Sequence, residues 1–129
     1  MKFRFLAFAA AMGGLMLAAL NVAAHHSNAA MYDANKRTTI KGELTKVEWT
    51  NPHAWLHLEV KSADGKVTNW ALEGFPPNTL LRTGWQRNML KTGDILTVEG
   101  AVARDGSNLM LAREVTLPDG RKLYWGPAS

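Results

Sequence analysis

The chain has 129 residues, of which 47% are hydrophobic, and it carries 15 basic against 11 acidic side chains and no cysteine. This length allows one small domain. The lack of cysteine excludes disulfide bonds, thiolate metal sites, iron–sulfur clusters and cysteine nucleophiles, because each of these needs a thiol.

The first 24 residues are predicted to be an export signal. Lys2 and Arg4 precede an uncharged apolar run over residues 6–20, and small side chains follow at residues 22–24, which is the layout of a cleaved secretory signal. The run is shorter than the roughly 20 residues that a retained membrane anchor needs. We therefore expect cleavage after Ala24 and no retained membrane span. Cleavage lowers the net charge from +4 to +2, which leaves no basic footprint for a nucleic acid.

The mature chain is expected to begin with an N-terminal arm over residues 25–37, followed by a single domain over residues 38–129. A first strand is predicted over Thr38–Thr50, which is rich in β-branched residues, with a bend or bulge at Gly42. Asn51-Pro52 then ends the strand, because proline donates no hydrogen bond to a sheet and restricts the residue before it.

The next segment is predicted to be a strand over His53–Val60, because apolar and other side chains alternate along it. A three-residue loop over Ala63–Gly65 connects it to a third strand over Lys66–Gly74, and Gly65 suits the left-handed position of such a turn. This loop length keeps the apolar sides of both strands facing inward. The predicted inner pairs are Leu56 with Leu72, Leu58 with Trp70, and Val60 with Thr68.

The remaining elements are predicted to be one helix and three strands. Asn78 is a candidate cap for a short helix over Phe75–Arg82, which Gly84 ends. The later strands are predicted over Ile95–Ala103, Leu109–Leu117 and Arg121–Trp125. We therefore predict an all-β domain with one short helix, in the order of the OB-fold, as a small barrel of five to six strands. Split sandwiches and other small barrels stay open, because the sequence does not give the order of strands in space.

Four histidines are the candidate metal ligands, and two of them lie at the expected new N-terminus. Cleavage after Ala24 makes His25 the first residue, so that its free amine and its imidazole are able to chelate a metal together. Nitrogen donors of this kind suit copper, zinc and nickel. A histidine in this position resembles the histidine brace of copper oxidases and of several exported copper carriers. The four candidates are His25, His26, His53 and His57.

His53 and His57 point to the same side of their predicted strand but lie about 13 Å apart, at about 3.3 Å per residue. A metal needs each ligand nitrogen at about 2 Å, so we expect one of these histidines, rather than both, to act with the N-terminal arm. Glu73 lies opposite Trp55 in the predicted register, diagonal to both histidines, as an oxygen ligand or as a group that orients a histidine. Asn69 lies on the same outer face.

Trp55 stands at the centre of this outer face and, with Trp49, forms a candidate binding face. OB-folds commonly bind ligands on this side of their second and third strands. A tryptophan between two histidines is also unusual on a surface that contacts only water. The face is therefore a candidate site for a protein, a glycan or another small ligand.

Each candidate also has an ordinary structural interpretation. His53 then satisfies backbone groups at a strand start, His57 is a surface histidine, and Glu73 is a solvated strand carboxylate. The two N-terminal histidines then belong to a tail that suits signal peptidase. The remaining tryptophans, Trp49, Trp70, Trp85 and Trp125, are then core residues or plugs at the barrel ends.

Enzyme signatures are mostly absent. The sequence holds no Gly-x-Ser-x-Gly elbow, no phosphate-binding loop and no His-Glu-x-x-His motif. Acid–base chemistry by His57 with Glu73 rests only on the predicted register. We therefore expect a binding protein rather than an enzyme, and a metal-using enzyme stays open as a third interpretation.

Six segments form a recognisable set of motifs: His25–Ser27, Tyr32-Asp33, Val47–His53, Asp64–Trp70, Leu90–Asp94 and Leu117–Arg121. Together they resemble an uncharacterised family of small exported proteins from Gram-negative bacteria, known only as a domain of unknown function. The similarity covers nearly the whole mature chain, and the His-His-Ser start and the Trp-Thr-Asn-Pro-His motif are its most specific features. The chain departs from the family pattern at Asn28 and Met31, where an aromatic and an acidic residue are usual. The resemblance implies a periplasmic address and supplies no activity, ligand or catalytic residue.

The sequence thus favours a periplasmic β-barrel protein that binds copper or zinc through His25 and a strand histidine. The alternative is a metal-independent module that binds an envelope protein, a glycan or another small ligand through the Trp55 face.

Overall fold

The computed structural model describes residues 28–128. The predicted export signal and the first two histidines lie outside the described residues. The chain divides into two compact units, Met1–Met31 and Tyr32–Ser129, and residues 28–31 of the first unit form one helical turn. No helix in the described part is long and apolar enough to cross a membrane.

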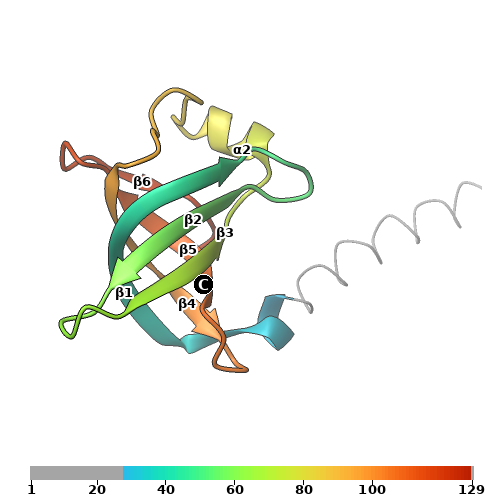
Figure 1. Cartoon of the computed structure of the whole chain (residues 1–129). Helices are drawn as coiled ribbons and strands as arrows, with labels where there is room; N and C mark the ends of the chain where they lie inside the picture. Colours follow the sequence, from blue (N-terminus) through green and yellow to red (C-terminus); the bar gives the residue numbers. More distant parts are fainter. Residues whose placement is uncertain (1–27, 129) are drawn as a thin grey trace, which may run out of the picture. The chain divides into compact units, whose positions relative to one another are not determined.

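The second unit consists mainly of β-strands, with one short helix between β3 and β4 (Figure 1). The prediction of a mostly-β chain with a short helix is therefore confirmed. The elements are β1 (Tyr32–Glu48), β2 (Trp55–Lys61), β3 (Val67–Glu73), α2 (Pro77–Arg82), β4 (Ile95–Ala103), β5 (Leu109–Thr116) and β6 (Lys122–Tyr124).

The strands form one sheet in the order β3-β2-β1-β4-β5-β6, and β3 also pairs with β5. All of these pairs are antiparallel except β3–β5, which is parallel. β1 is shared between two neighbours, because residues 32–43 pair with β4 and residues 43–48 pair with β2. Figure 1 shows β1 as a long, curved strand. The pairings among β1 to β5 therefore form a closed circuit, β1-β2-β3-β5-β4.

The predicted register of the β2–β3 hairpin is confirmed. The inner Cα partners are Leu56 with Leu72, Leu58 with Trp70, and Val60 with Thr68. Gly65 has a φ of +84°, which is the left-handed conformation that the three-residue loop requires. The apolar sides of both strands consequently face the core, and the other side of β2 is left for polar and aromatic residues.

The course of β1 differs from the prediction in two respects. The strand begins at Tyr32 rather than at Thr38. The regular pairing with β4 starts at Arg37, and Tyr32 pairs with Ala103 of β4 on the other side of a register shift between Tyr32 and Arg37. The register between β1 and β2 skips Thr45, so the bulge lies there and not at Gly42. Gly42 is needed for a different reason, which is close packing: a Cβ at this position would lie 2.5 Å from the carbonyl oxygen of Glu59.

The start of α2 also differs from the prediction. Pro76 is the N-cap residue and makes no side-chain cap bond, so Asn78 is not the cap. Pro77 is the first residue of the helix. An N–H at this position has no partner within the helix, so its absence in proline costs no hydrogen bond, and the fixed φ of proline suits the first turn. Gly84 follows the helix with a φ of +107°, which confirms that the helix ends before it.

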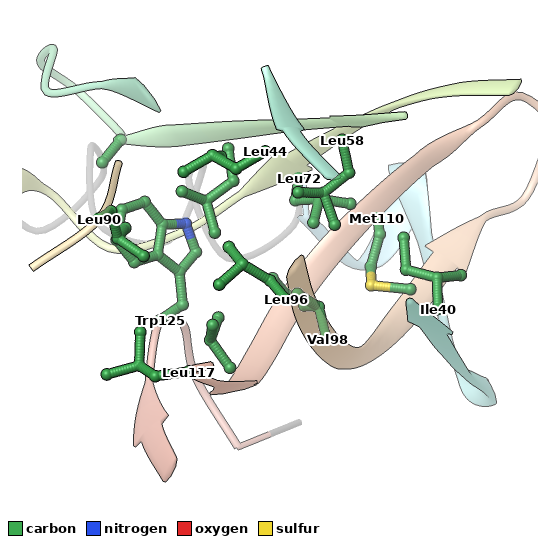
Figure 2. Packing of buried hydrophobic residues seen from close by; sticks show 14 of the residues in the cluster. Ile40, Leu44, Leu58, Leu72, Leu90, Leu96, Val98, Met110, Leu117 and Trp125 are labelled. Atoms are coloured by element: carbon green, nitrogen blue, oxygen red, sulfur yellow. The ribbon is translucent and has the colours of Figure 1, made fainter. Parts of the chain in front are cut away.

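The hydrophobic core contains two buried tryptophans. Trp85 and Trp125 are 1% and 0% exposed, and their rings meet edge to face with 5.1 Å between centroids. Trp49 and Trp70 are partly buried and pack against the same cluster. Figure 2 shows Leu44, Leu90 and Leu96 near the ring of Trp125, with Met110 and Ile40 at the other end of the labelled group. The interpretation as core residues is therefore confirmed for Trp85 and Trp125, whereas Trp49 and Trp70 lie at the edge of the core.

Candidate functional site

The outer side of β2 and of the two residues before it carries the residues that the sequence marked as candidates; β2 begins at Trp55, two residues later than the predicted strand start at His53. His53, Trp55 and His57 alternate with core residues, so they lie on the side away from the core, and all three are partly exposed. Trp55 pairs with Glu48 of β1 on one side and with Glu73 of β3 on the other. Carboxylates of two different strands therefore flank the two histidines.

The backbone around His53 holds it next to Glu73. Gly74 donates its N–H to the carbonyl oxygen of Ala54 at 2.9 Å, which extends the contact between β2 and β3 toward residue 53. The Thr50 hydroxyl donates to the His53 carbonyl oxygen at 3.2 Å. These contacts fix the backbone on both sides of the His53 side chain, whose imidazole contacts Glu73.

Glu73 is shared by two partners. Nδ1 of His53 lies 2.7 Å from Oε1, and the Tyr32 hydroxyl donates to Oε2 at 2.5 Å. Only 7% of Glu73 is exposed, and burial of a carboxylate is tolerated when hydrogen bonds replace its water. The interpretation of Glu73 as a solvated carboxylate is therefore wrong, and the structure places it where it orients a histidine.

Tyr32 is the site residue that the sequence reasoning missed. It is 2% exposed and packs with Ala101 and Leu111 in a small second cluster. Burial, followed by the hydrogen bond and the charge of Glu73, raises the pKa of the Tyr32 hydroxyl, which therefore stays protonated and donates. The Tyr32-Asp33 pair among the family motifs is the signal in the sequence that points to it.

His57 belongs to a second, more open group. Its Nε2 lies 2.8 Å from Oε2 of Glu48, and Nζ of Lys46 lies 2.6 Å from Oε1 of the same carboxylate. The hydrogen bond from Lys46, and then that from His57, lowers the pKa of Glu48. The side chains of His57 and Glu48 are 32% and 31% exposed, so water screens these interactions.

The structure therefore keeps His53 and His57 apart, as their spacing predicted. One contacts a carboxylate of β3 and the other a carboxylate of β1. Within residues 28–128, no group of three histidine or acidic side chains is arranged to hold a metal ion. His25 and His26, the other two candidate ligands, lie outside the described residues.

A hollow of about 310 Å³ lies on the outer face beside His57. Ala71 pairs with His57 on β2 and with Leu109 on β5, so the surface dips where a small side chain stands between larger neighbours. Asn69 is exposed on β3 and lines this hollow together with Asn108. The outer face thus offers carboxamide and imidazole groups around an apolar floor.

The two tryptophans of the candidate binding face have different surroundings. Trp55 is partly exposed and stands between the two histidine–carboxylate pairs. Trp49 packs edge-on against Trp125 at 5.6 Å between centroids, and the guanidinium of Arg87 lies 5.2 Å from the centre of its ring. Trp55 therefore belongs to the outer face of β2, whereas Trp49 belongs to the edge of the core.

Residues 12–112 match the sequence profile of a family described as Family of unknown function (DUF6152). No curated protein and no solved structure matches the chain. The expected resemblance to an uncharacterised family is therefore confirmed.

Proposed function

The chain belongs to the DUF6152 family of unknown function, and from the geometry of the site we propose that it is a periplasmic protein that binds a transition metal. In this proposal the export signal is cleaved after Ala24, and His25 supplies its amine and its imidazole. The imidazole of His53 supplies a further nitrogen ligand from the second unit, and His26 is available as an additional donor. Copper is preferred to zinc, because divalent copper binds nitrogen donors more tightly than zinc does.

The contact between His53 and Glu73 carries this proposal. Glu73 occupies Nδ1 at 2.7 Å, and the His53 side chain is 33% exposed, so Nε2 is the nitrogen left to bind an ion. Histidine ligands in metal sites almost always donate their other ring N–H to a carboxylate, a carbonyl or water. In His57 the carboxylate of Glu48 lies at Nε2 instead, which leaves Nδ1, the nitrogen nearer the backbone, and Lys46 also binds that carboxylate. The geometry therefore favours His53 over His57 as the strand ligand.

The length of chain before Tyr32 also supports the proposal. His25 precedes Tyr32 by seven residues, and at about 3.3–3.6 Å per residue this segment spans at most roughly 25 Å. Tyr32 in turn bonds Glu73, the residue that holds His53. An arm of this length is compatible with the proposed role of His25.

The proposed scaffold is an OB-fold-like barrel. The closed circuit of pairings from β1 to β5, with α2 between β3 and β4, supports this assignment. β6 is then a strand added to the common five. Barrels of this kind often bind ligands on the β2–β3 face, which is the face that carries His53.

Metal titration of the processed protein tests the proposal. Protein purified after export is checked by mass spectrometry for His25 as its first residue and is then titrated with Cu(II) and Zn(II) by calorimetry. We expect one equivalent of copper to bind in the micromolar range or tighter. His25→Ala and His53→Ala should each lose more than the roughly 10–100-fold in affinity that outer-sphere partners contribute, whereas His57→Ala should bind as the unsubstituted chain does. Millimolar or sub-stoichiometric binding, or a titration unchanged in His25→Ala, overturns the proposal.

The hollow beside His57 favours a second candidate function, a metal-independent module for a neutral polar ligand such as a glycan. Asn69 and Asn108 offer amide donors and acceptors there, while the charges of Lys46 and Glu48 offset each other. On this account Ala71→Leu, which fills the hollow, should abolish retention on an immobilised glycan.

Trp55→Ala separates the two candidate functions. In the glycan-binding account it abolishes retention and leaves the copper content unchanged. Retention that persists in both Ala71→Leu and Trp55→Ala removes the second candidate.

A further inference from the structure

Among the charged side chains that the structure describes, Glu73 is the one that is buried, with 7% of its surface exposed. Burial of a carboxylate costs free energy unless hydrogen bonds replace the lost water, and an apolar residue of similar volume is often at least as stable. Both oxygens of Glu73 are used, Oε1 by Nδ1 of His53 and Oε2 by the Tyr32 hydroxyl. Packing alone therefore does not account for a glutamate at this position.

The chemistry of the three groups fixes where their protons lie. A carboxylate only accepts hydrogen bonds, so both partners of Glu73 have to donate. A neutral His53 then carries its proton on Nδ1 and its lone pair on Nε2. Tyr32 remains a donor, because burial and Glu73 raise the pKa of its hydroxyl. Glu73 thus selects one of the two tautomers of His53.

The second histidine has the opposite arrangement. His57 contacts Glu48 through Nε2 at 2.8 Å, which leaves Nδ1, the nitrogen nearer the backbone, as the other ring nitrogen. Glu48 also bonds Lys46 and is open to water. The two pairs share their residue types, and both histidines lie on the same outer side, His53 two residues before β2 and His57 within it. Substitution of Glu48 is therefore a matched control for substitution of Glu73.

We propose that Glu73 and Tyr32 are the positioning residues of the metal site: Glu73 holds His53 with Nε2 as the ligating nitrogen, and the Tyr32 hydroxyl holds Glu73. This inference deepens the proposed function and rests on it.

The first test needs no metal. Long-range ¹H–¹⁵N spectra of the imidazoles in the full processed chain report which ring nitrogen of a neutral histidine carries the proton. We expect the Nδ1–H tautomer at His53, loss of this preference in Glu73→Leu, and an unchanged His53 signal in Glu48→Leu. A His53 proton on Nε2, or a tautomer that is the same in Glu73→Leu, overturns the positioning role.

The second test is titration of the same proteins with Cu(II). We expect binding to weaken roughly 10–100-fold in Glu73→Leu, less in Tyr32→Phe, and not at all in Glu48→Leu. If Glu73→Leu fails to fold, the double variant with Tyr32→Phe replaces it, because no buried hydroxyl is then left without a partner.

The outcomes separate the two proposals. Equal copper affinity in all variants overturns the positioning role and leaves metal binding intact. A chain that shows the Nδ1–H tautomer but binds no copper overturns the proposed function, and with it the role of Glu73 in a metal site.

Discussion

The histidine–carboxylate pairs of His53 and His57 have nearly equal contact distances, but the surroundings of their carboxylates differ. Nδ1 of His53 lies 2.7 Å from Glu73, whose side chain is 10% exposed, whereas Nε2 of His57 lies 2.8 Å from Glu48, whose side chain is 31% exposed. Around Glu48, water and Lys46 compete for the same oxygens. Around Glu73, burial leaves the two protein donors as its partners. The comparison shows that burial, rather than distance, decides which of two similar contacts fixes the orientation of a side chain.

The largest expected effect is that of Glu73→Ala on stability. It leaves the Tyr32 hydroxyl buried without a partner and removes the carboxylate that His53 contacts, so we expect a loss of about 2–4 kcal/mol in the free energy of unfolding. Glu48→Ala should leave the midpoint of urea unfolding unchanged within error. Equal shifts in the two variants would contradict the contrast between the pairs.

Tyr32→Phe should have a smaller effect, because it retains the buried ring and removes only the hydroxyl. We expect a loss of about 1–3 kcal/mol, since one oxygen of Glu73 is left unsatisfied. Tyr124→Phe is the matched control, because Tyr124 is 53% exposed. Thermal unfolding followed by circular dichroism measures both, and a loss in Tyr124→Phe as large as that in Tyr32→Phe would argue against a special role for the Tyr32 hydroxyl.

The pH dependence of stability on the alkaline side should also depend on Tyr32. Its folded-state pKa is raised above the unfolded value of about 10, so the unfolded chain loses this proton first as the pH rises. The contribution of Tyr32 is therefore fully present below about pH 10 and declines above it. Unfolding midpoints measured between about pH 9 and pH 11 should fall less steeply in Tyr32→Phe than in the unsubstituted chain. Identical slopes would show that the hydroxyl is not buried in this way.

The smallest expected effect concerns Glu48 in acid. Its pKa is lowered by Lys46 and then by His57, so its contribution is present above the unfolded value of about 4.3 and is lost as the pH falls through the folded value. Because this carboxylate is open to solvent, the contribution should be slight and should disappear at high salt. Acid unfolding of Glu48→Gln at low and high ionic strength measures it. A loss that persists at high salt would place Glu48 in a less solvated setting.

Much of the β2–β3 hairpin was predictable because its determinants are local. Alternation along His53–Val60 sets which side faces the core, and Gly65 sets the loop length, so the pairing of Trp55 with Glu73 followed from both. The cap of α2 was harder, since both Asn78 and Pro77 are plausible first-turn residues and the position of Pro76 decides between them.

The choice of partner for each histidine was not predictable from the hairpin. In that register Glu73 is diagonal to both His53 and His57, and nothing local distinguishes them. Two remote features decide it. The bulge at Thr45 sets the register that brings Glu48 to His57, and Tyr32, 41 residues before Glu73 in the chain, returns to the sheet beyond an irregular stretch of β1. Irregular strand pairing of this kind has no short-range sequence signal.

Electron paramagnetic resonance of the 1:1 Cu(II) complex, in protein that begins at His25, tests the central claim most directly. The nitrogen coupling pattern reports the ligands of the bound ion. The account predicts a spectrum that changes in His53→Ala and is retained in His57→Ala. A spectrum that is the same in the unsubstituted chain and in His53→Ala would contradict the assignment of His53 as the strand ligand.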